Sequence, residues 1–450
     1  MKTILRNTMK NINTNLNQLK SIFILAILII IAACSKDEAE PSPIVQNPTT
    51  GFTISSILPS SGAKNTNVLL TGTGFSNTVA ENIVTINGKS CTVNSASTTQ
   101  INITIPPSAG SGKIKVAVGS NNAESTVFEF INTFLVSTYV GTVRGFADGQ
   151  GGIEKFAIPI ATVFDNAGNM YVADIFNHKI RKVTPSRLVS TFAGSTNGFQ
   201  DAVGTDAKFS FPNCITIDNA GNLYVADAND KIRKITPSGS VSTFAGSTAG
   251  FADGPGAVAK FNGINALAVD NAGNLFVSDS SNHCIRKVAT TGLVTTFAGS
   301  SRGFAEGQGT AAQFNFPVGI AIDASNNIIV ADGVNRRIRK ISQTGLVSTI
   351  AGGTEGNSDG QGNTAQFQVL SGVVVDATGN IYVSDNLSHR IRKITATGLV
   401  TTIAGTTEGD TDGNVAVAKF RNPALLSLDA QGNIYVADGQ NHKIRKITID

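Results

Sequence analysis

The sequence has few of the residues that usually build catalytic or cross-linked sites: no tryptophan, three methionines, four cysteines and four histidines among 450 residues. The cysteines Cys34, Cys91, Cys214 and Cys284 share no local spacing, so we expect no disulfide bond. A phosphate-binding glycine loop, a zinc-ligand spacing and a Ser/His/Asp set are also missing. The sequence therefore specifies no reaction, and we expect no catalytic residue, no metal and no cofactor.

What the sequence does contain is a repeat. Each of six copies opens with an aspartate, and successive copies are 53, 52, 53, 53 and 53 residues apart. These aspartates are Asp165, Asp218, Asp270, Asp323, Asp376 and Asp429. A fixed period of this length is typical of propellers and solenoids.

Each period contains four short runs rich in Ile and Val, separated by Gly, Asn, Asp and Ser, as in strands joined by hairpin turns. In the fourth copy these runs are 317–322, 328–331, 337–341 and 346–351. The second run is apolar on both faces, which an inner strand needs because neighbouring blades cover both of its sides. Four strands in each of six copies predict an all-β fold, a six-bladed β-propeller.

The last copy stops before its fourth strand. The first five copies continue into a Val-Ser/Thr-Thr-Phe/Ile-Ala-Gly run, whereas the sequence reaches Asp450 without one. A sixth run of this kind lies upstream of the first copy, at residues 135–141. We therefore expect strand 135–141 to complete the last blade and close the ring, in a propeller that spans residues 132–450.

The repeat is similar to a known family. Gly-Asn-Leu/Ile-Tyr-Val-Ala-Asp followed by Asn-His-x-Ile-Arg-Lys, as at residues 432–446, resembles the NHL repeat. The resemblance covers residues 135–450 and implies the propeller fold. It does not imply one function, because propellers host unrelated activities.

Residues 52–131 have a different pattern. Alternating apolar positions and regular turn signals, such as Val84-x-Ile86-Asn87-Gly88, predict a small β-sandwich. Its spacing resembles an IPT/TIG domain, an immunoglobulin-like fold. The resemblance implies a spacer or an interaction module.

We expect residues 1–33 to be a signal peptide. Their charged residues are all basic, and their apolar run, 22–31, is too short to span a bilayer. The segment ends in Ala32-Ala33-Cys34, which resembles a bacterial lipoprotein box and makes Cys34 the expected lipidation site. A plain N-terminal membrane anchor is the alternative. Residues 34–51 are then a polar tether.

The tether begins with Ser35-Lys36-Asp37-Glu38, which resembles the export signal of Bacteroidota surface lipoproteins. An ordinary acidic tether is the alternative. Export would anchor the protein to the outer membrane by its lipid, facing the cell exterior. Removing the four basic residues of the signal leaves 31 basic and 31 acidic residues. With the repeated Ile-Arg-Lys triplets spread evenly round the ring, this balance does not favour nucleic acid as a partner.

All four histidines occupy one repeat position, in the loop between the second and third strands. The position holds His178, Asp230, His283, Arg336, His389 and His442 in the six copies. A ring of metal ligands is one interpretation. We favour the other, in which the residue belongs to the turn of the repeat and bonds to backbone. Similarly, we expect the Asp of Tyr-Val-Ala/Ser-Asp and the Lys of Ile-Arg-Lys to pair or to cap turns.

The long loop from the fourth strand of one blade to the first strand of the next is the candidate binding site. Its first four copies carry an exposed-looking Phe after Gly, and the last two carry Asn or Asp there. The candidate ligand-binding residues are Phe146, Phe199, Phe251, Phe304, Asn357, Asp359, Asp410 and Asp412. An aromatic arc beside a polar arc suits sugar rings, and local loop packing is the alternative. Residues 410–414 also resemble a calcium loop, but the required downstream Glu is missing.

Three functions fit these observations. We favour a non-catalytic binding module of a cell-surface lipoprotein, with an extracellular glycan or protein as its partner. The second is a metal-dependent lyase or lactonase that uses the central channel, and the third is a structural partner in an outer-membrane assembly. The enzyme would need histidines outside the shared repeat position, and the sequence has none left.

Overall fold

The computed structural model describes residues 51–449. This part of the chain is nearly all β, with seven short 3₁₀ turns between its strands. The expected signal peptide (1–33), Cys34 and, apart from Gly51, the expected tether (34–51) lie outside the described residues. Within residues 51–449, no helix is long and apolar enough to cross a membrane.

Residues 53–130 form an immunoglobulin-like β-sandwich of two sheets, with strand orders β1-β3-β7-β6 and β2-β9-β8-β4-β5. Alternate residues of β3 and β7, among them Val68, Leu70, Ile101 and Ile103, are fully buried in its core. The elements are β1 (Thr53–Leu58), β2 (Ser61–Gly62), β3 (Asn67–Thr73), η1 (Val79–Glu81), β4 (Ile83–Ile86), β5 (Lys89–Ser90), β6 (Thr92–Ala96), β7 (Gln100–Thr104), β8 (Gly112–Val118) and β9 (Asn121–Phe130).

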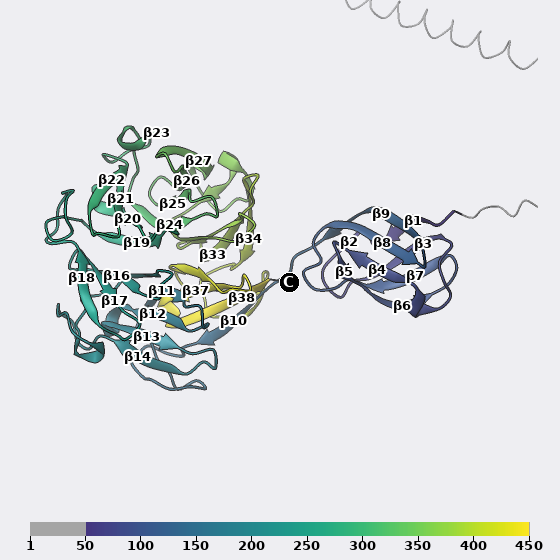
Figure 1. The fold of residues 1–450 in the computed structure, drawn as a ribbon, viewed down its shortest axis with the longest axis horizontal. Helices are drawn as coiled ribbons and strands as arrows, with labels where there is room; N and C mark the ends of the chain where they lie inside the picture. Colours follow the sequence, from purple (N-terminus) through teal and green to yellow (C-terminus); the bar gives the residue numbers. More distant parts are fainter. Residues whose placement is uncertain (1–50, 450) are drawn as a thin grey trace, which may run out of the picture. The chain divides into compact units, whose positions relative to one another are not determined.

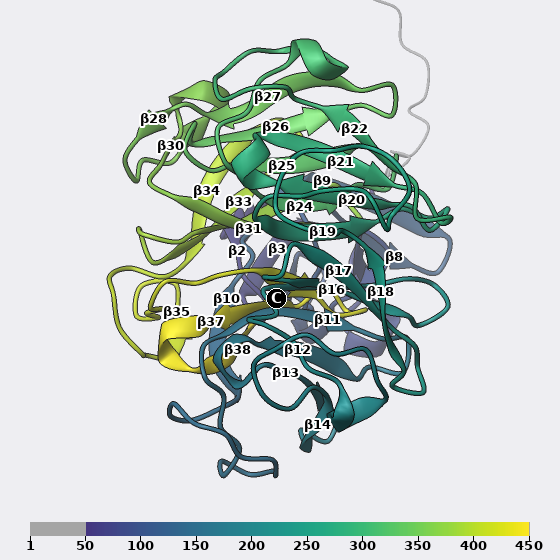
Figure 2. The ribbon, with the colours of Figure 1, turned by 90° about the vertical axis from the view of Figure 1, so that its left-hand side faces the viewer.

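The rest of the described chain is a six-bladed propeller (Figure 1; Figure 2). The first three blades are β11 (Pro159–Phe164), β12 (Met170–Asp174), β13 (Lys179–Val183) and β14 (Val189–Ala193); β15 (Cys214–Ile217), β16 (Leu223–Asp227), β17 (Lys231–Ile235) and β18 (Val241–Ala245); and β19 (Ile264–Val269), β20 (Leu275–Asp279), β21 (Cys284–Val288) and β22 (Val294–Ala298). The next two are β24 (Pro317–Ile322), β25 (Ile328–Asp332), β26 (Arg337–Ile341) and β27 (Leu346–Gly352); and β31 (Leu370–Val375), β32 (Ile381–Asp385), β33 (Arg390–Ile394) and β34 (Leu399–Ala404).

The sixth blade combines both ends of the propeller. Its strands are β36 (Leu426–Leu428), β37 (Ile434–Asp438), β38 (Lys443–Ile449) and β10 (Phe134–Val140). Strand β10 covers most of the segment that we expected to close the ring, and it pairs antiparallel with β38, with Val136 opposite Ile447 (Figure 1). The fourth strand of this blade therefore comes from the start of the propeller and its first three strands from the end, with the two-residue strand β35 (Gly413–Asn414) paired to the outer edge of β10.

Short elements lie in the loops between blades and in the turns between second and third strands. They are η2 (Ile175–Asn177), η3 (Gly204–Asp206), η4 (Ser280–Asn282), β23 (Gly307–Gln308), η5 (Gly309–Ala311), β28 (Thr354–Glu355), β29 (Gly360–Gln361), η6 (Gly362–Thr364), β30 (Gln366–Phe367), β35 (Gly413–Asn414) and η7 (Gly439–Asn441).

The second strand of each blade is buried along its whole length, which explains why its sequence is apolar on both faces.

The Asp that opens each repeat organises the hairpin turn between the first and second strands. In the first blade, Asp165 Oδ1 accepts hydrogen bonds from the backbone N–H groups of Ala167 (3.0 Å) and Asn169 (2.8 Å). Gly168 completes the turn at φ +80°, a conformation that favours glycine.

Candidate functional site: the loop-bearing face of the propeller

Two kinds of loop meet at one end of the strands. Because neighbouring strands are antiparallel, the turn between the second and third strands and the long loop after the fourth strand emerge on the same side. Asn177 of the first blade shows the contact: its Nδ2 donates to the backbone oxygen of Gly145 in the long loop, at 2.9 Å. Asn282, Asn335 and Asn441 repeat it at 2.8 Å. We call this side the loop-bearing face.

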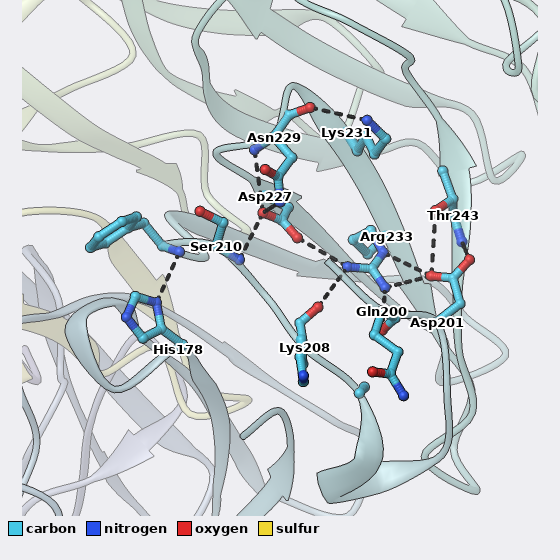
Figure 3. A network of polar contacts seen from close by, with 12 residues as sticks. His178, Gln200, Asp201, Lys208, Ser210, Asp227, Asn229, Lys231, Arg233 and Thr243 are labelled. Carbon is cyan, nitrogen blue, oxygen red and sulfur yellow. Dashed lines mark hydrogen bonds and ion pairs between the residues drawn. The ribbon is translucent and has the colours of Figure 1, made fainter. Parts of the chain in front are cut away.

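One arginine in each blade is completely buried and holds the two kinds of loop together. These residues are Arg181, Arg233, Arg286, Arg339, Arg392 and Arg445. In the second blade, Arg233 Nη1 lies 3.0 Å from Asp227 Oδ2 and donates to the backbone oxygen of Lys208, also at 3.0 Å (Figure 3). Arg233 also pairs with Asp201 of the long loop, and Asp201 accepts a hydrogen bond from the backbone N–H of Thr243 at 3.0 Å.

The carboxylate that ends each second strand is buried beside this arginine. Burial raises the pKa of Asp438 to about 6, against the opposing effects of the Arg421 backbone N–H, Asn441 and Arg445. Arg445 pairs with Asp438 at 3.0 Å and favours its ionised form. The sequence pattern assigned this kind of pairing to the Asp and the Lys of each repeat. The structure shows that the Arg of Ile-Arg-Lys is the buried partner.

The four loop phenylalanines lie over these arginines. Phe146, Phe199, Phe251 and Phe304 are between 46% and 58% exposed. The Arg181 guanidinium carbon is 4.8 Å from the ring centre of Phe146 and 5.1 Å from that of the buried Phe156, and the next three blades repeat this sandwich. A second cation also lies over three of the rings: Lys179 over Phe146, Lys231 over Phe199 and Arg337 over Phe304. Each exposed ring therefore packs locally against cationic groups, and about half of its surface stays accessible to solvent.

The four predicted polar residues lie in the last two loops and are partly engaged within the protein. Asp359 pairs with Arg392 at 2.8 Å and accepts from the Thr402 backbone N–H at 3.0 Å. Asp412 makes the same contacts with Arg445 and Thr138, and Asp410 pairs with Lys443. Asn357 and Asp359 line one pocket of about 380 Å³ together with Arg390. The structure thus brings Asn357 and Asp359 to a common hollow, and Asp410 and Asp412 lie in the neighbouring loop.

The histidines are parts of turns, as one of the two sequence interpretations held. His178 adopts a left-handed backbone conformation, φ 55°, and its Nδ1 accepts a hydrogen bond from the backbone N–H of Phe211 in the next blade at 3.2 Å (Figure 3). His283, His389 and His442 do the same. Among residues 51–449, no group of three or more His, Cys, Asp or Glu side chains is arranged to hold a metal ion.

Sequence reasoning missed a group of exposed apolar residues nearer the inner strands on the same face. Phe176, Phe316, Val334, Val369 and Leu387 are all between 38% and 50% exposed. They belong either to the segment just before a first strand or to the turn after a second strand.

The segment before the first strand is also conformationally unusual. Ile158, Phe211 and Phe316 have φ values of 58°, 48° and 57°, a region that β-branched and bulky residues rarely adopt. The sequence carried a signal for this, because two other copies hold Gly263 and Asn422 at the same position.

The first strands of all six blades line a central cavity of about 310 Å³. Most of the lining is aliphatic, and its polar side chains are Thr162, Thr216, Ser427 and Cys214. Thr162 and Ser427 share a hydrogen bond of 2.6 Å between their hydroxyls. Burial raises the pKa of the Cys214 thiol to about 12, so it stays protonated at neutral pH. The channel thus offers hydroxyls and an unreactive thiol to a ligand.

Two sequence families match the chain. The IPT/TIG domain matches residues 53–130. The SMP-30/gluconolactonase/LRE-like region matches residues 161–408, which is more than half of the chain. The chain belongs to the SMP-30/gluconolactonase/LRE-like family. Both matches agree with the two resemblances noted in the sequence, and this family member carries a TIG domain ahead of its NHL-like propeller.

Curated relatives of this SMP-30/gluconolactonase/LRE-like protein include human NHL repeat-containing protein 2, which is 28% identical over 336 residues, 64% of this chain and 46% of the relative. The chloroplastic protein SUPPRESSOR OF QUENCHING 1 of Arabidopsis thaliana is 28% identical over 287 residues, 58% of this chain and 27% of the relative. The chain therefore spans less than half the length of either relative.

Solved structures share the fold of this SMP-30/gluconolactonase/LRE-like protein at low sequence identity. A protein of unknown function from Bacteroides thetaiotaomicron superposes with a TM-score of 0.59 and 20% identity, covering 90% of this chain and 99% of the other. An auxiliary nutrient binding protein from the same organism has a TM-score of 0.56 with the same identity and coverage.

Proposed function

We propose that this protein is a surface lipoprotein whose propeller binds an extracellular glycan or protein without turning it over. The observation that carries the proposal is the set Phe146, Phe199, Phe251 and Phe304, four rings that are about half exposed yet packed against buried guanidinium groups. A ring whose orientation is fixed before binding loses little entropy when a ligand stacks on it.

Between the two ligand classes, we favour a polysaccharide. Aromatic faces stack on the apolar faces of sugar rings, and carboxylate and amide groups bond to sugar hydroxyls. The pocket that contains Asn357 and Asp359 supplies such polar groups beside the aromatic arc. A binding role is also supported by fold likeness, since auxiliary nutrient binding proteins of Bacteroides thetaiotaomicron and Bacteroides ovatus have TM-scores of 0.56 and 0.55 with this chain.

The lactonase or lyase alternative has the name of the family in its favour. Such chemistry in the channel needs an acid, a base or a metal ligand. The side chains that line the channel are aliphatic, aromatic, hydroxyl and thiol groups. Binding on the loop-bearing face therefore has more support from this chain than catalysis in the channel.

We also propose where the protein is located: Cys34 carries the lipid, and Lys36, Asp37 and Glu38 direct the protein to the outside of the outer membrane. Protease added to intact cells should then remove the propeller. Replacing Lys36, Asp37 and Glu38 with Ala should protect it, and protection of the wild type at normal expression would contradict surface exposure.

Binding without turnover is tested by calorimetric titration of the purified protein with a panel of polysaccharides. Product analysis with and without divalent metals follows. We expect at least one polysaccharide to bind and none to be cleaved. Metal-dependent turnover of any of them would favour the enzyme instead. Absence of binding across the panel, with co-purification of an outer-membrane protein, would favour the structural role.

A further inference from the structure

A second hollow lies on the side opposite the loop-bearing face, where the last blade meets the first. Its volume is about 800 Å³, and its walls include Tyr139, Phe164, Arg187, Tyr435 and Lys446. These residues surround the turns between first and second strands and between third and fourth strands. We call this hollow the seam cavity.

Three of these five residues depart from the repeat. Tyr139 stands where the other blades have Phe192, Phe244, Phe297, Ile350 and Ile403. Phe164 stands where they have Ile217, Val269, Ile322, Val375 and Leu428. Arg187 stands where the next four have Gly239, Gly292, Gly345 and Gly398. The seam cavity therefore collects an extra hydroxyl, an extra aromatic ring and an extra cation that the six-fold pattern does not require.

Arg187 occupies a backbone conformation that suits glycine. Its φ is +66°, and the four equivalent glycines have φ between +84° and +91°. The turn is otherwise unchanged: the Arg187 backbone N–H donates to the Thr184 oxygen at 2.8 Å, as Gly239 does to Thr236. A residue with a side chain costs stability at such a position, and strain of this kind is often found at functional sites.

The guanidinium of Arg187 is available to a ligand. Its carbon lies 5.0 Å from the ring centre of Tyr139, which packs edge-to-face with Tyr435 at 5.0 Å. Phe164 packs against the same Tyr435 ring at 4.7 Å. Arg187 is exposed, and within residues 51–449 no carboxylate forms an ion pair with it.

Two carboxylates, Asp165 and Asp429, also line the cavity, and both are bonded within their own turns. Asp165 accepts from the backbone N–H groups of Ala167 and Asn169, and Asp429 accepts from those of Gln431 and Asn433. Asp429 also lies 3.6 Å from Lys446 Nζ. Asp165 forms no ion pair within residues 51–449, but Asn169 Nδ2 (2.8 Å) and the Tyr171 hydroxyl (3.4 Å) also donate to its carboxylate. Arg187 is therefore the charged group of the cavity that remains open to an anionic ligand.

A hollow at the corresponding place between the third and fourth blades can be compared with the seam cavity. Its volume is about 430 Å³, and its walls include Phe276, Phe297 and Gln343. Gln343 Nε2 donates across it to the Ser325 backbone oxygen at 2.6 Å, and the position of Arg187 is taken by Gly345. The same architecture without the three departures thus gives a smaller hollow with no exposed arginine.

We propose that the seam cavity binds an acidic sugar residue, a pyranose ring that carries a carboxylate. The planar fork of Arg187 matches a carboxylate in a bidentate arrangement. The aromatic walls formed by Tyr139, Phe164 and Tyr435 suit the apolar face of the sugar ring. This site is on the opposite face from the loop phenylalanines, so it stands without the function proposed above.

The test is calorimetric titration of the purified full chain with trigalacturonate, with the neutral trisaccharide maltotriose, and with benzoate. We expect trigalacturonate to bind at least tenfold more tightly than either of the others. Absence of trigalacturonate binding would overturn the proposal. Benzoate binding as tight as that of trigalacturonate would show a site for aromatic acids and would overturn the assignment to a sugar.

Three variants locate the site. Arg187→Gly should weaken trigalacturonate binding at least tenfold and raise the melting temperature, because it removes the guanidinium and restores the unstrained turn. The matched control Gly239→Arg should lower the melting temperature and leave binding unchanged. The double variant Phe251→Ala with Phe304→Ala should also leave trigalacturonate binding unchanged, which separates this site from the loop-bearing face. Unchanged affinity in Arg187→Gly, or loss of affinity in the phenylalanine variant, would contradict the proposal.

Discussion

His442 Nδ1 accepts a hydrogen bond from the backbone N–H of Ile158 at 3.2 Å, and this bond joins the last blade to the first across 284 residues of sequence. The same bond links His178 to Phe211, Asp230 to Gly263, His283 to Phe316 and His389 to Asn422. In all five cases the donor residue has a positive φ.

The sixth position shows what the bond does. Arg336 stands at the acceptor position and offers no lone pair, and the facing Val369 lacks a positive φ. Its N–H instead donates to Asp385 of its own blade at 3.2 Å. The unusual backbone beside the inner strands therefore accompanies the interblade bonds, which keep the neighbouring apolar residues in place.

These bonds predict a dependence of stability on pH. An imidazole can accept at Nδ1 only when it is unprotonated there, and burial lowers the pKa values of His178, His283 and His442, with nearby Lys or Arg charges adding to the effect. Below the unfolded value of about 6.5, the unfolded chain binds more protons than the folded chain, so stability falls as pH falls. We therefore expect the histidine bonds to contribute less to the melting temperature at pH 5.5 than at pH 7.5.

A variant isolates the histidines from other groups. Burial raises the pKa of the six carboxyls that end the second strands, that of Asp438 to about 6, and these shifts act in the opposite direction as pH falls. Replacing His178, His283 and His442 with Asn keeps an acceptor and tolerates a positive φ. From pH 7.5 to pH 5.5, the melting temperature of the variant should fall less, or rise more, than that of the wild type. An equal change in both proteins would show that the histidine bonds do not contribute.

Replacing one of the buried arginines should strongly lower the stability of the propeller. Arg233→Met would leave the Asp227 carboxylate buried without its cation, and we expect the free energy of unfolding to fall by about 3–5 kcal/mol. Adding Asp227→Asn to Arg233→Met should recover part of the loss. The control Lys234→Met changes the next residue, which is only partly buried, and should cost less than about 1 kcal/mol. Equal denaturant midpoints for Arg233→Met and Lys234→Met would contradict this account.

Ring closure predicts that strand β10 is needed for a stable propeller. A chain that begins at Gly145 lacks β10 and would leave β38 with an unpaired edge, which favours association with other chains. A chain that begins at Asn132 keeps β10. We expect the shorter chain to melt at a lower temperature and to form larger species in light scattering. The idea would be wrong if both chains melted at the same temperature and remained monomeric.

Much of the fold follows from the sequence because the repeat is written six times. The spacing of the aspartates, the apolar second strands and the turn signals all predict four-stranded blades, and the six-bladed fold class is confirmed. The role of Arg233 was not visible in the same pattern. Blades cover both faces of these strands, so alternation along Ile232 to Lys234 does not show which polar side chain is buried.

The candidate site was predicted less completely, because its contacts cross between loops and blades. Asp359 and Asp412 were expected to bond to a ligand, and the structure shows that each also pairs with a buried arginine 33 residues further along the chain. Departures from the repeat were the better signal. Arg187 at a glycine position was visible in the sequence, but its place beside Tyr139 depends on closure of the ring.

The most direct test of the proposed binding role is the affinity of the double variant Phe251→Ala with Phe304→Ala for a polysaccharide that the wild type binds. Stacking contributes about 1 kcal/mol per ring, so we expect affinity to fall roughly tenfold to thirtyfold, with little change in melting temperature. The matched control Leu293→Ala with Leu346→Ala removes two equally exposed apolar side chains from the opposite side and should leave affinity unchanged. Wild-type affinity in the phenylalanine variant, or loss of its fold, would show that these rings serve only local packing.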